Sequence, residues 1–148
     1  MNIIAIDPSI NEAGWACTDQ DIQLSGVIKT KGKTETEKIR DLCIELSIII
    51  QKHDIQEVIV EIAEGFTYQR SANIYGKAMN AGSMYKNGMA SGAIIALMGM
   101  SNIKTETVGA TFWKGKMGKK MAMMITQKTN NNEADAIMLL RWYLARRR

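Results

Sequence analysis

The fold is decided first by the stretch IIAIDPS, residues 3–9. Its unbroken apolar run, Ile3 to Ile6, predicts a strand that is buried on both faces. Pro8 cannot continue a central strand, because proline lacks the backbone N–H that a ladder hydrogen bond needs. The strand therefore ends at Asp7, and we expect this carboxylate near the centre of a sheet.

Two more strands are expected directly after this stretch. Residues 13–18 and 22–29 have strand-like composition, and the turn residues 19–21 separate them. Because the connections are short, we expect these strands to form an antiparallel meander with the first one.

Later in the chain, the apolar run at residues 58–60 repeats the pattern of the first strand, since it also ends at a carboxylate, Glu61. If the two strands are adjacent and parallel, their ends bring Asp7 and Glu61 together. A fifth strand is expected over about residues 103–108.

Capping signals and apolar periodicity predict the helices. A helix over about residues 34–52 begins with a capping box formed by Thr34 and Glu37. Cys43 lies on its apolar face, so we expect this thiol in the core. Residues 71–100 are rich in Ala, Gly and Met, which predicts one long helix or two.

The last helix supplies a third carboxylate. The asparagines at 130–132 are typical of a helix cap and predict a helix from Glu133 to about Arg147. Asp135 then lies in its first turn.

Composition narrows the possible chemistry. The 148 residues include two cysteines and one histidine, which excludes a disulfide framework and cysteine-rich or histidine-rich metal sites. The net charge is +4, yet residues 1–74 carry 7 Lys and Arg against 12 Asp and Glu, whereas residues 75–148 carry 12 against 3. The basic half favours a polyanionic partner, although an uneven solvated surface is the alternative.

Neither a targeting signal nor a membrane span is expected. The first apolar run has no basic region before it and ends at an acid, unlike a signal peptide. The weakly polar stretch 88–100 is too short to cross a hydrocarbon layer of ~30 Å. We therefore expect a cytoplasmic protein with reduced thiols and no membrane partner.

The carboxylates Asp7, Glu61 and Asp135 together predict a metal site. Clustered carboxylates repel one another, and Mg²⁺ prefers such oxygen ligands. Two Mg²⁺ ions ~4 Å apart, or Mn²⁺ in their place, can drive phosphodiester hydrolysis without histidine or cysteine. Taken singly, each acid could instead be a turn or cap residue.

The ordered motifs resemble those of the RuvC-type Holliday junction resolvases, which belong to the RNase H-like nucleases. The matching segments are residues 3–9 with 14–16, 58–61, 113–120 and 132–136. The resemblance implies a single α/β, RNase H-like domain over residues 1–148, with a five-stranded mixed sheet, strands 1–3 antiparallel, flanked by helices. It also implies a homodimer, formed through residues 71–100, that binds a four-way DNA junction and makes paired nicks.

The resemblance implies that Asp7, Glu61 and Asp135 are catalytic metal ligands. It places Asn132 at a fourth position, where the family usually has an acid or a histidine. Three residues before Asp135, Asn132 shares its helix face and offers a neutral carbonyl oxygen. It is either a weak natural ligand or the mark of a neutralised site. Glu133 should point elsewhere, since it lies ~200° around the helix from Asp135.

Basic and aromatic residues are expected to contact DNA. The candidates for phosphate contact are Lys114, Lys116, Lys119 and Lys120. The resemblance implies that a basic residue of this stretch, which we take as Lys119, also stabilises transition-state charge. The candidates in the loop after Glu61 are Phe66, Tyr68 and Arg70. Their aromatic rings either stack on exposed bases or pack under their own loop. The arginines at 146–148 could make a further contact with the DNA backbone or form a frayed tail, and we expect the tail.

Three functions remain open at this point. The first is a metal-dependent endonuclease that resolves Holliday or other branched junctions. The second is another RNase H-like nuclease, which acts on RNA–DNA hybrids. The third is a non-catalytic or impaired junction-binding form, which Asn132 keeps under consideration. An actin-like ATPase lacks support, because no second glycine-rich phosphate loop is present.

Overall fold

The computed structural model describes residues 1–20, 22–63 and 81–147. Its centre is a five-stranded sheet in the order β3-β2-β1-β4-β5. The strands are β1 (Asn2–Asp7), β2 (Glu12–Asp19), β3 (Ile22–Lys29), β4 (Ile55–Ile62) and β5 (Lys104–Gly109). The first three are antiparallel, whereas β4 pairs in parallel with β1 and β5. The predicted mixed sheet is confirmed.

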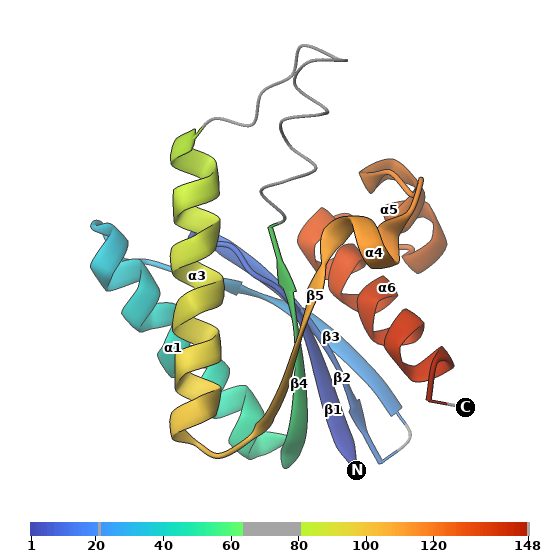
Figure 1. The fold of residues 1–148 in the computed structure, drawn as a ribbon, viewed down its shortest axis with the longest axis horizontal. Coiled ribbons are helices and arrows are strands. Elements are labelled where there is room, and N and C mark those ends of the chain that lie inside the picture. Colours follow the sequence, from blue (N-terminus) through green and yellow to red (C-terminus); the bar gives the residue numbers. More distant parts are fainter. Residues whose placement is uncertain (21, 64–80, 148) are drawn as a thin grey trace.

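Helices cover both faces of this sheet (Figure 1). On one face lie α1 (Glu35–Lys52) and α3 (Ala81–Met100), and on the other lie α4 (Ala110–Lys114), α5 (Lys119–Thr126) and α6 (Asn131–Ala145). The predicted capping box at the start of α1 is present, since Thr34 and Glu37 each accept a hydrogen bond from the backbone N–H of the other. In the part of the chain that the structure describes, no helix is long and apolar enough to span a membrane.

The central strand β1 divides its side chains between two cores. Ile4 and Ile6 belong to the core beneath α1 and α3, whereas Ile3 and Ala5 belong to the core beneath α6. This alternation explains the unbroken apolar run, because both faces of the strand are covered. It also places Asp7, two residues beyond Ala5, on the α6 face.

Three local expectations are corrected. Helix α6 begins at Asn131 with Asn130 as its cap, so Asp135 lies in its second turn and not its first. Cys43 is half-buried and not in the core, because it lies at the border of the apolar face of α1. The arginine tail is not frayed at Arg147, whose guanidinium pairs with the buried carboxylate of Glu57.

Candidate metal and DNA site

Two of the predicted acids extend from adjacent parallel strands. In the pairing of β1 with β4, Ile6 lies opposite Val60, so Asp7 and Glu61 occupy the next positions. Because side chains alternate along a strand, both carboxylates point to the face that α6 covers. Their meeting therefore follows from the register of two strands.

The third acid, Asp135, is 2% exposed on α6. Two asparagines at the start of α6 attach the helix to Glu12 of β2. Asn132 Nδ2 donates to the backbone oxygen of Glu12, and Nδ2 of the cap residue Asn130 donates to the Glu12 carboxylate. Gly14 permits this close approach, because a Cβ there would lie 1.9 Å from the backbone oxygen of Asn132. Glycine at this position lets the start of α6 reach the strand ends.

A lysine and a tryptophan from α4 contact the acids. Lys114 Nζ lies 2.6 Å from Asp135 Oδ2 and 3.5 Å from Glu61 Oε2. Trp113 donates its indole N–H to Glu61 Oε2 at 2.9 Å. The sequence places Lys114 among the DNA contacts and Lys119 in the catalytic set, whereas the structure places the ammonium of Lys114 on the acids. Trp113 was not anticipated, because a buried tryptophan there is equally typical of core packing.

The cluster opposes full ionisation of its own acids. Burial raises the pKa of Asp7 well above its usual range, the charge of Glu61 raises it further, and Lys114 partly offsets both. Burial also raises the pKa of Glu61, while Lys114 opposes the rise and Asp135 adds to it. The pKa of Lys114 is raised, because its carboxylate neighbours, Glu61 first, outweigh the effect of burial. The ammonium groups of Lys114 and Lys119 both lower the pKa of Asp7, but they do not offset burial and the neighbouring carboxylates.

The three acids and Lys114 line one cavity of about 470 Å³. Lys119 and Asn132 line it as well. A further wall comes from α3, through Ser83, Lys86 and Asn87. Their i, i+3, i+4 spacing places them on one side of the helix. That spacing can be read in the sequence, but nothing there links it to the acids.

The donor set fits divalent cations. Asp135 Oδ1 is buried and has no hydrogen-bond partner among the described residues. Such an oxygen, beside two more carboxylates with raised pKa values, offers the hard ligands that Mg²⁺ and Mn²⁺ prefer. As they stand, no three Asp, Glu, His or Cys side chains of the described residues are arranged to hold an ion. A cation bound at Asp135 Oδ2 would have to displace the ammonium of Lys114, which lies 2.6 Å from that oxygen.

The other predicted residues are dispersed. Lys116 is exposed between α4 and α5, and Lys120 lies on α5 in a shallow groove that does not include the acids. Glu133 points away, as predicted, and bonds Ser25 and Lys128. All three candidates in the loop after Glu61 lie outside the described residues; they are Phe66, Tyr68 and Arg70.

The five-stranded mixed sheet and its flanking helices form an RNase H-like α/β fold, and comparisons with solved structures agree with this fold. Thermus thermophilus RuvC in complex with a Holliday junction substrate superimposes with a TM-score of 0.72 at 17% identity, over 98% of this chain and 95% of that one. Another Thermus thermophilus RuvC structure gives 0.64 at 19% identity, over 93% and 90%. The yeast mitochondrial Holliday junction resolvase gives 0.54 at 12%, over 95% and 79%. At these identities the likeness concerns the fold.

A sequence relative gives a second line of comparison. The crossover junction endodeoxyribonuclease RuvC of Campylobacter curvus (strain 525.92) is 32% identical over 66 residues. This match spans 41% of this chain and 42% of the relative, which is less than half of either. No protein-family model matches the chain. The resemblance to RuvC-type resolvases is thus confirmed in part of the sequence and in the fold of nearly the whole chain.

Proposed function

We propose that this chain is a metal-dependent endonuclease of the RuvC type, acting in the cytoplasm. It binds four-way (Holliday) or other branched DNA junctions and resolves them by paired phosphodiester nicks. One observation carries the proposal: Asp7, Glu61 and Asp135 line a single cavity in a fold that matches Thermus thermophilus RuvC along 98% of the chain. The Campylobacter curvus relative is a crossover junction endodeoxyribonuclease, which supports the same substrate class.

The acids Asp7, Glu61 and Asp135 would hold the ions, which we propose to be two Mg²⁺ per site, with Mn²⁺ as a substitute. Bound there, such ions would supply activation of the attacking water and stabilisation of the leaving 3′ oxygen. The side chains of this chain prepare the site. Trp113 holds one oxygen of Glu61 in place, and Lys114 brings positive charge to the position where the phosphate must enter.

We propose that Asn132 holds α6 in place and does not bind the metal. Its Nδ2 donates to the backbone of β2, and its Oδ1 accepts from Asn131 Nδ2. Both ends of the amide are therefore engaged, so we propose that metal binding does not depend on an acid at this position.

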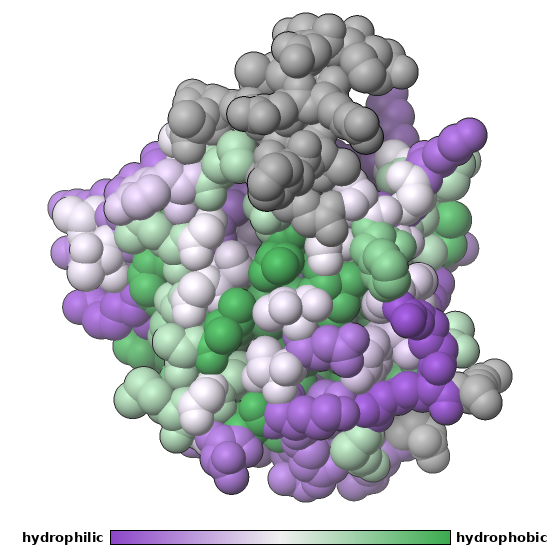
Figure 2. Space-filling view, viewed as in Figure 1, coloured by the Kyte–Doolittle hydropathy of each residue, from purple (hydrophilic) through white to green (hydrophobic). Residues whose placement is uncertain are grey.

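We propose that a homodimer forms through α3. Residues 87–103 include no charged residue. Gly88, Gly92 and Gly99 have open space where a Cβ would be, and Ile95 and Met100 are exposed. Figure 2 shows this pale to green surface over α3. A two-fold dimer matches the symmetry of a four-way junction and yields two nicks. Light scattering on the full chain would measure the dimer directly.

A substrate and metal panel tests the activity. The full chain is incubated with a synthetic four-way junction, the matching linear duplex and an RNA–DNA hybrid, each with Mg²⁺, Mn²⁺ or EDTA. We expect symmetric nicks on the junction alone, and none in EDTA. Equal cutting of the duplex would contradict junction selectivity, and cutting of the hybrid by a monomer would favour the second nuclease class.

The variant Asn132→Asp separates the active from the impaired form. If Asn132 is architectural, nicking by Asn132→Asp stays within a fewfold of the wild type. Tight junction binding without cleavage in the wild type, with cleavage restored in Asn132→Asp, would identify a neutralised site instead.

A further inference from the structure

One side of α6 carries a repeating set of residues. Asp135, Leu139 and Tyr143 are four positions apart, and Arg147 follows four positions after Tyr143, two residues past the end of the helix. At 3.6 residues per turn, residues four apart lie along one side of a helix. Leu139 is fully buried and Tyr143 is 6% exposed, so this side faces the sheet. Asp135 stands at one end of the set and Tyr143 near the other.

The strand opposite, β4, presents a matching set. Glu57, Ile59 and Glu61 alternate with core residues of the other face and therefore point toward α6. From Glu57 to Glu61 the strand rises ~13 Å, and from Asp135 to Tyr143 the helix rises ~12 Å. Two polar contacts between helix and strand thus fall at nearly equal spacing on both elements.

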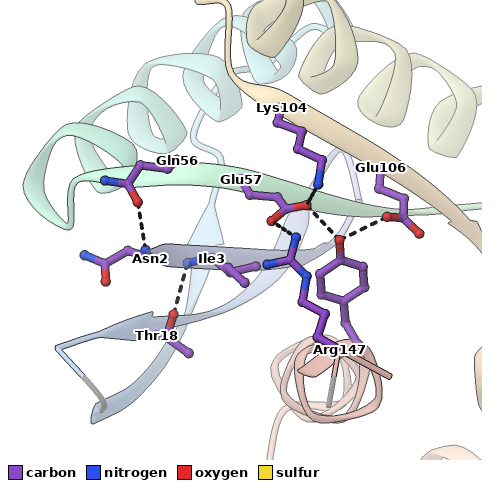
Figure 3. A network of polar contacts seen from close by, with 9 residues as sticks. Asn2, Ile3, Thr18, Gln56, Glu57, Lys104, Glu106 and Arg147 are labelled. Atoms are coloured by element: carbon purple, nitrogen blue, oxygen red, sulfur yellow. Dashed lines mark hydrogen bonds and ion pairs between the residues drawn. The ribbon is translucent and has the colours of Figure 1, made fainter. Parts of the chain in front are cut away.

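The second of these contacts centres on Glu57, which is fully buried (Figure 3). Tyr143 donates its hydroxyl proton to Glu57 Oε1 at 2.7 Å. Lys104 Nζ lies 2.6 Å from the same oxygen, and Arg147 pairs with Oε2. Glu106 Oε2 lies 3.0 Å from the Tyr143 hydroxyl. A buried acid in the middle of a strand is here fully satisfied by partners from β5 and α6.

Such a network specifies one arrangement more sharply than apolar packing does. Between the two polar contacts, Leu139 and Ile59 belong to the same apolar core, and apolar contacts are non-directional. A hydrogen bond requires both short distance and alignment. Sliding α6 by one residue would shift it 1.5 Å and rotate it 100°, which would break the bond between Tyr143 and Glu57.

We propose that Glu57 and Tyr143 are positioning residues for the acidic site. Their hydrogen bond holds α6 in the register and rotation that put Asp135 beside Glu61 and Lys114. The inference about geometry stands on these contacts, while its consequence for nicking rests on the function proposed above.

The test uses Tyr143→Phe, which removes the hydroxyl and keeps the ring. The first readout is the indole N–H resonance of Trp113 in the metal-free protein, assigned with Trp113→Phe, because this group bonds Glu61. The second is the Kd for Mn²⁺, and the third is the nicking rate at saturating junction. Leu46→Val is the control, since it weakens the core on the other face of the sheet.

We expect Tyr143→Phe to shift the Trp113 resonance, raise the Kd for Mn²⁺ about tenfold and slow nicking about tenfold, with junction affinity unchanged. Leu46→Val should leave the resonance and the Kd as in the wild type. Glu57→Gln, which keeps an acceptor for Tyr143, should keep the resonance near its wild-type position despite lower stability.

The proposal is overturned if Tyr143→Phe leaves the resonance and the Kd unchanged, or if Leu46→Val moves them equally. Wild-type protein that neither binds Mn²⁺ nor nicks a junction would defeat the proposed function. In that case the Trp113 resonance alone still decides whether the distant hydrogen bond positions the site.

Discussion

The two ends of α6 lie near strand carboxylates whose pKa values are shifted in opposite directions. At its beginning, burial and the charge of Glu61 raise the pKa of Asp7. Near its end, Glu57 is fully buried, yet its pKa is lowered. Burial alone would raise the pKa of Glu57, but hydrogen bonds from Lys104 and Tyr143 outweigh that effect.

The difference lies in the number of cations supplied to each end. Among the described residues, Lys114 alone pairs with Glu61 and Asp135, beside Asp7, whereas Lys104 and Arg147 both pair with Glu57. A fully paired buried acid specifies structure, while an under-compensated cluster in a cavity is typical of a functional site. The same helix and strand thus serve both purposes at opposite ends.

Neutralising one acid of the under-compensated cluster gives the largest expected effect. In Asp7→Asn, junction nicking should fall at least about a thousandfold, because a bound ion contributes several kcal/mol of transition-state stabilisation. The free energy of unfolding without metal should not fall, since a repelling charge is removed. The exposed acid Glu45 on α1 provides the control Glu45→Gln. Nicking by Asp7→Asn at the wild-type rate would contradict the assignment of the site.

A substitution at Gly14 should displace the first turn of α6 and so test the acidic end of the helix separately from the end near Glu57. Gly14→Ala forces a Cβ against the backbone of Asn132, so we expect the free energy of unfolding to fall by about 3 kcal/mol and metal binding to weaken. Glu45→Ala, at an exposed position of α1, is the control and should cost little. Urea denaturation measures both variants, and equal stability of the two would show that the close approach at Gly14 is not required.

Neutralising the fully paired acid Glu57 should lower the free energy of unfolding, whereas Asp7→Asn should not. In Glu57→Gln the free energy of unfolding should fall by about 2 kcal/mol, because charge-assisted hydrogen bonds are lost. Lys104 and Arg147 are partly exposed and can turn to solvent, which limits the loss. Glu106→Gln, at an exposed partner of the same network, is the control. A stabilising effect of Glu57→Gln would remove the contrast between the two ends.

The smallest expected effect is a dependence on pH. Because the folded-state pKa of Glu57 is lowered, its stabilisation is complete above the ordinary glutamate pKa of ~4.3 and is lost as the pH falls through the lowered value. The difference in unfolding free energy between wild type and Glu57→Gln should therefore shrink from pH 6 to pH 3. A difference that grows on acidification would mean that the pKa shift has the other sign.

Several parts of this arrangement are visible in local sequence. The apolar runs that end at Asp7 and Glu61 each need only a few residues, because burial on two faces excludes polar side chains within the run. The capping box at Thr34 is local as well. The contacts of Lys114 and Arg147 cannot be read from local sequence. Each lysine or arginine in the basic half resembles the others until the fold brings one of them to an acid.

The sequence by itself determined the order of the five strands, the helices α1, α3 and α6, and the three acids that end strands or lie near the start of α6, but not the short helices α4 and α5. Periodicity and capping are properties of neighbouring residues, so they can be read without a fold. Only the tertiary structure decided that Lys114 compensates the acids, that α3 lines their cavity and that Glu57 and Tyr143 join α6 to β4. These contacts connect residues far apart in the chain, and their geometry depends on helix rotation and strand register together.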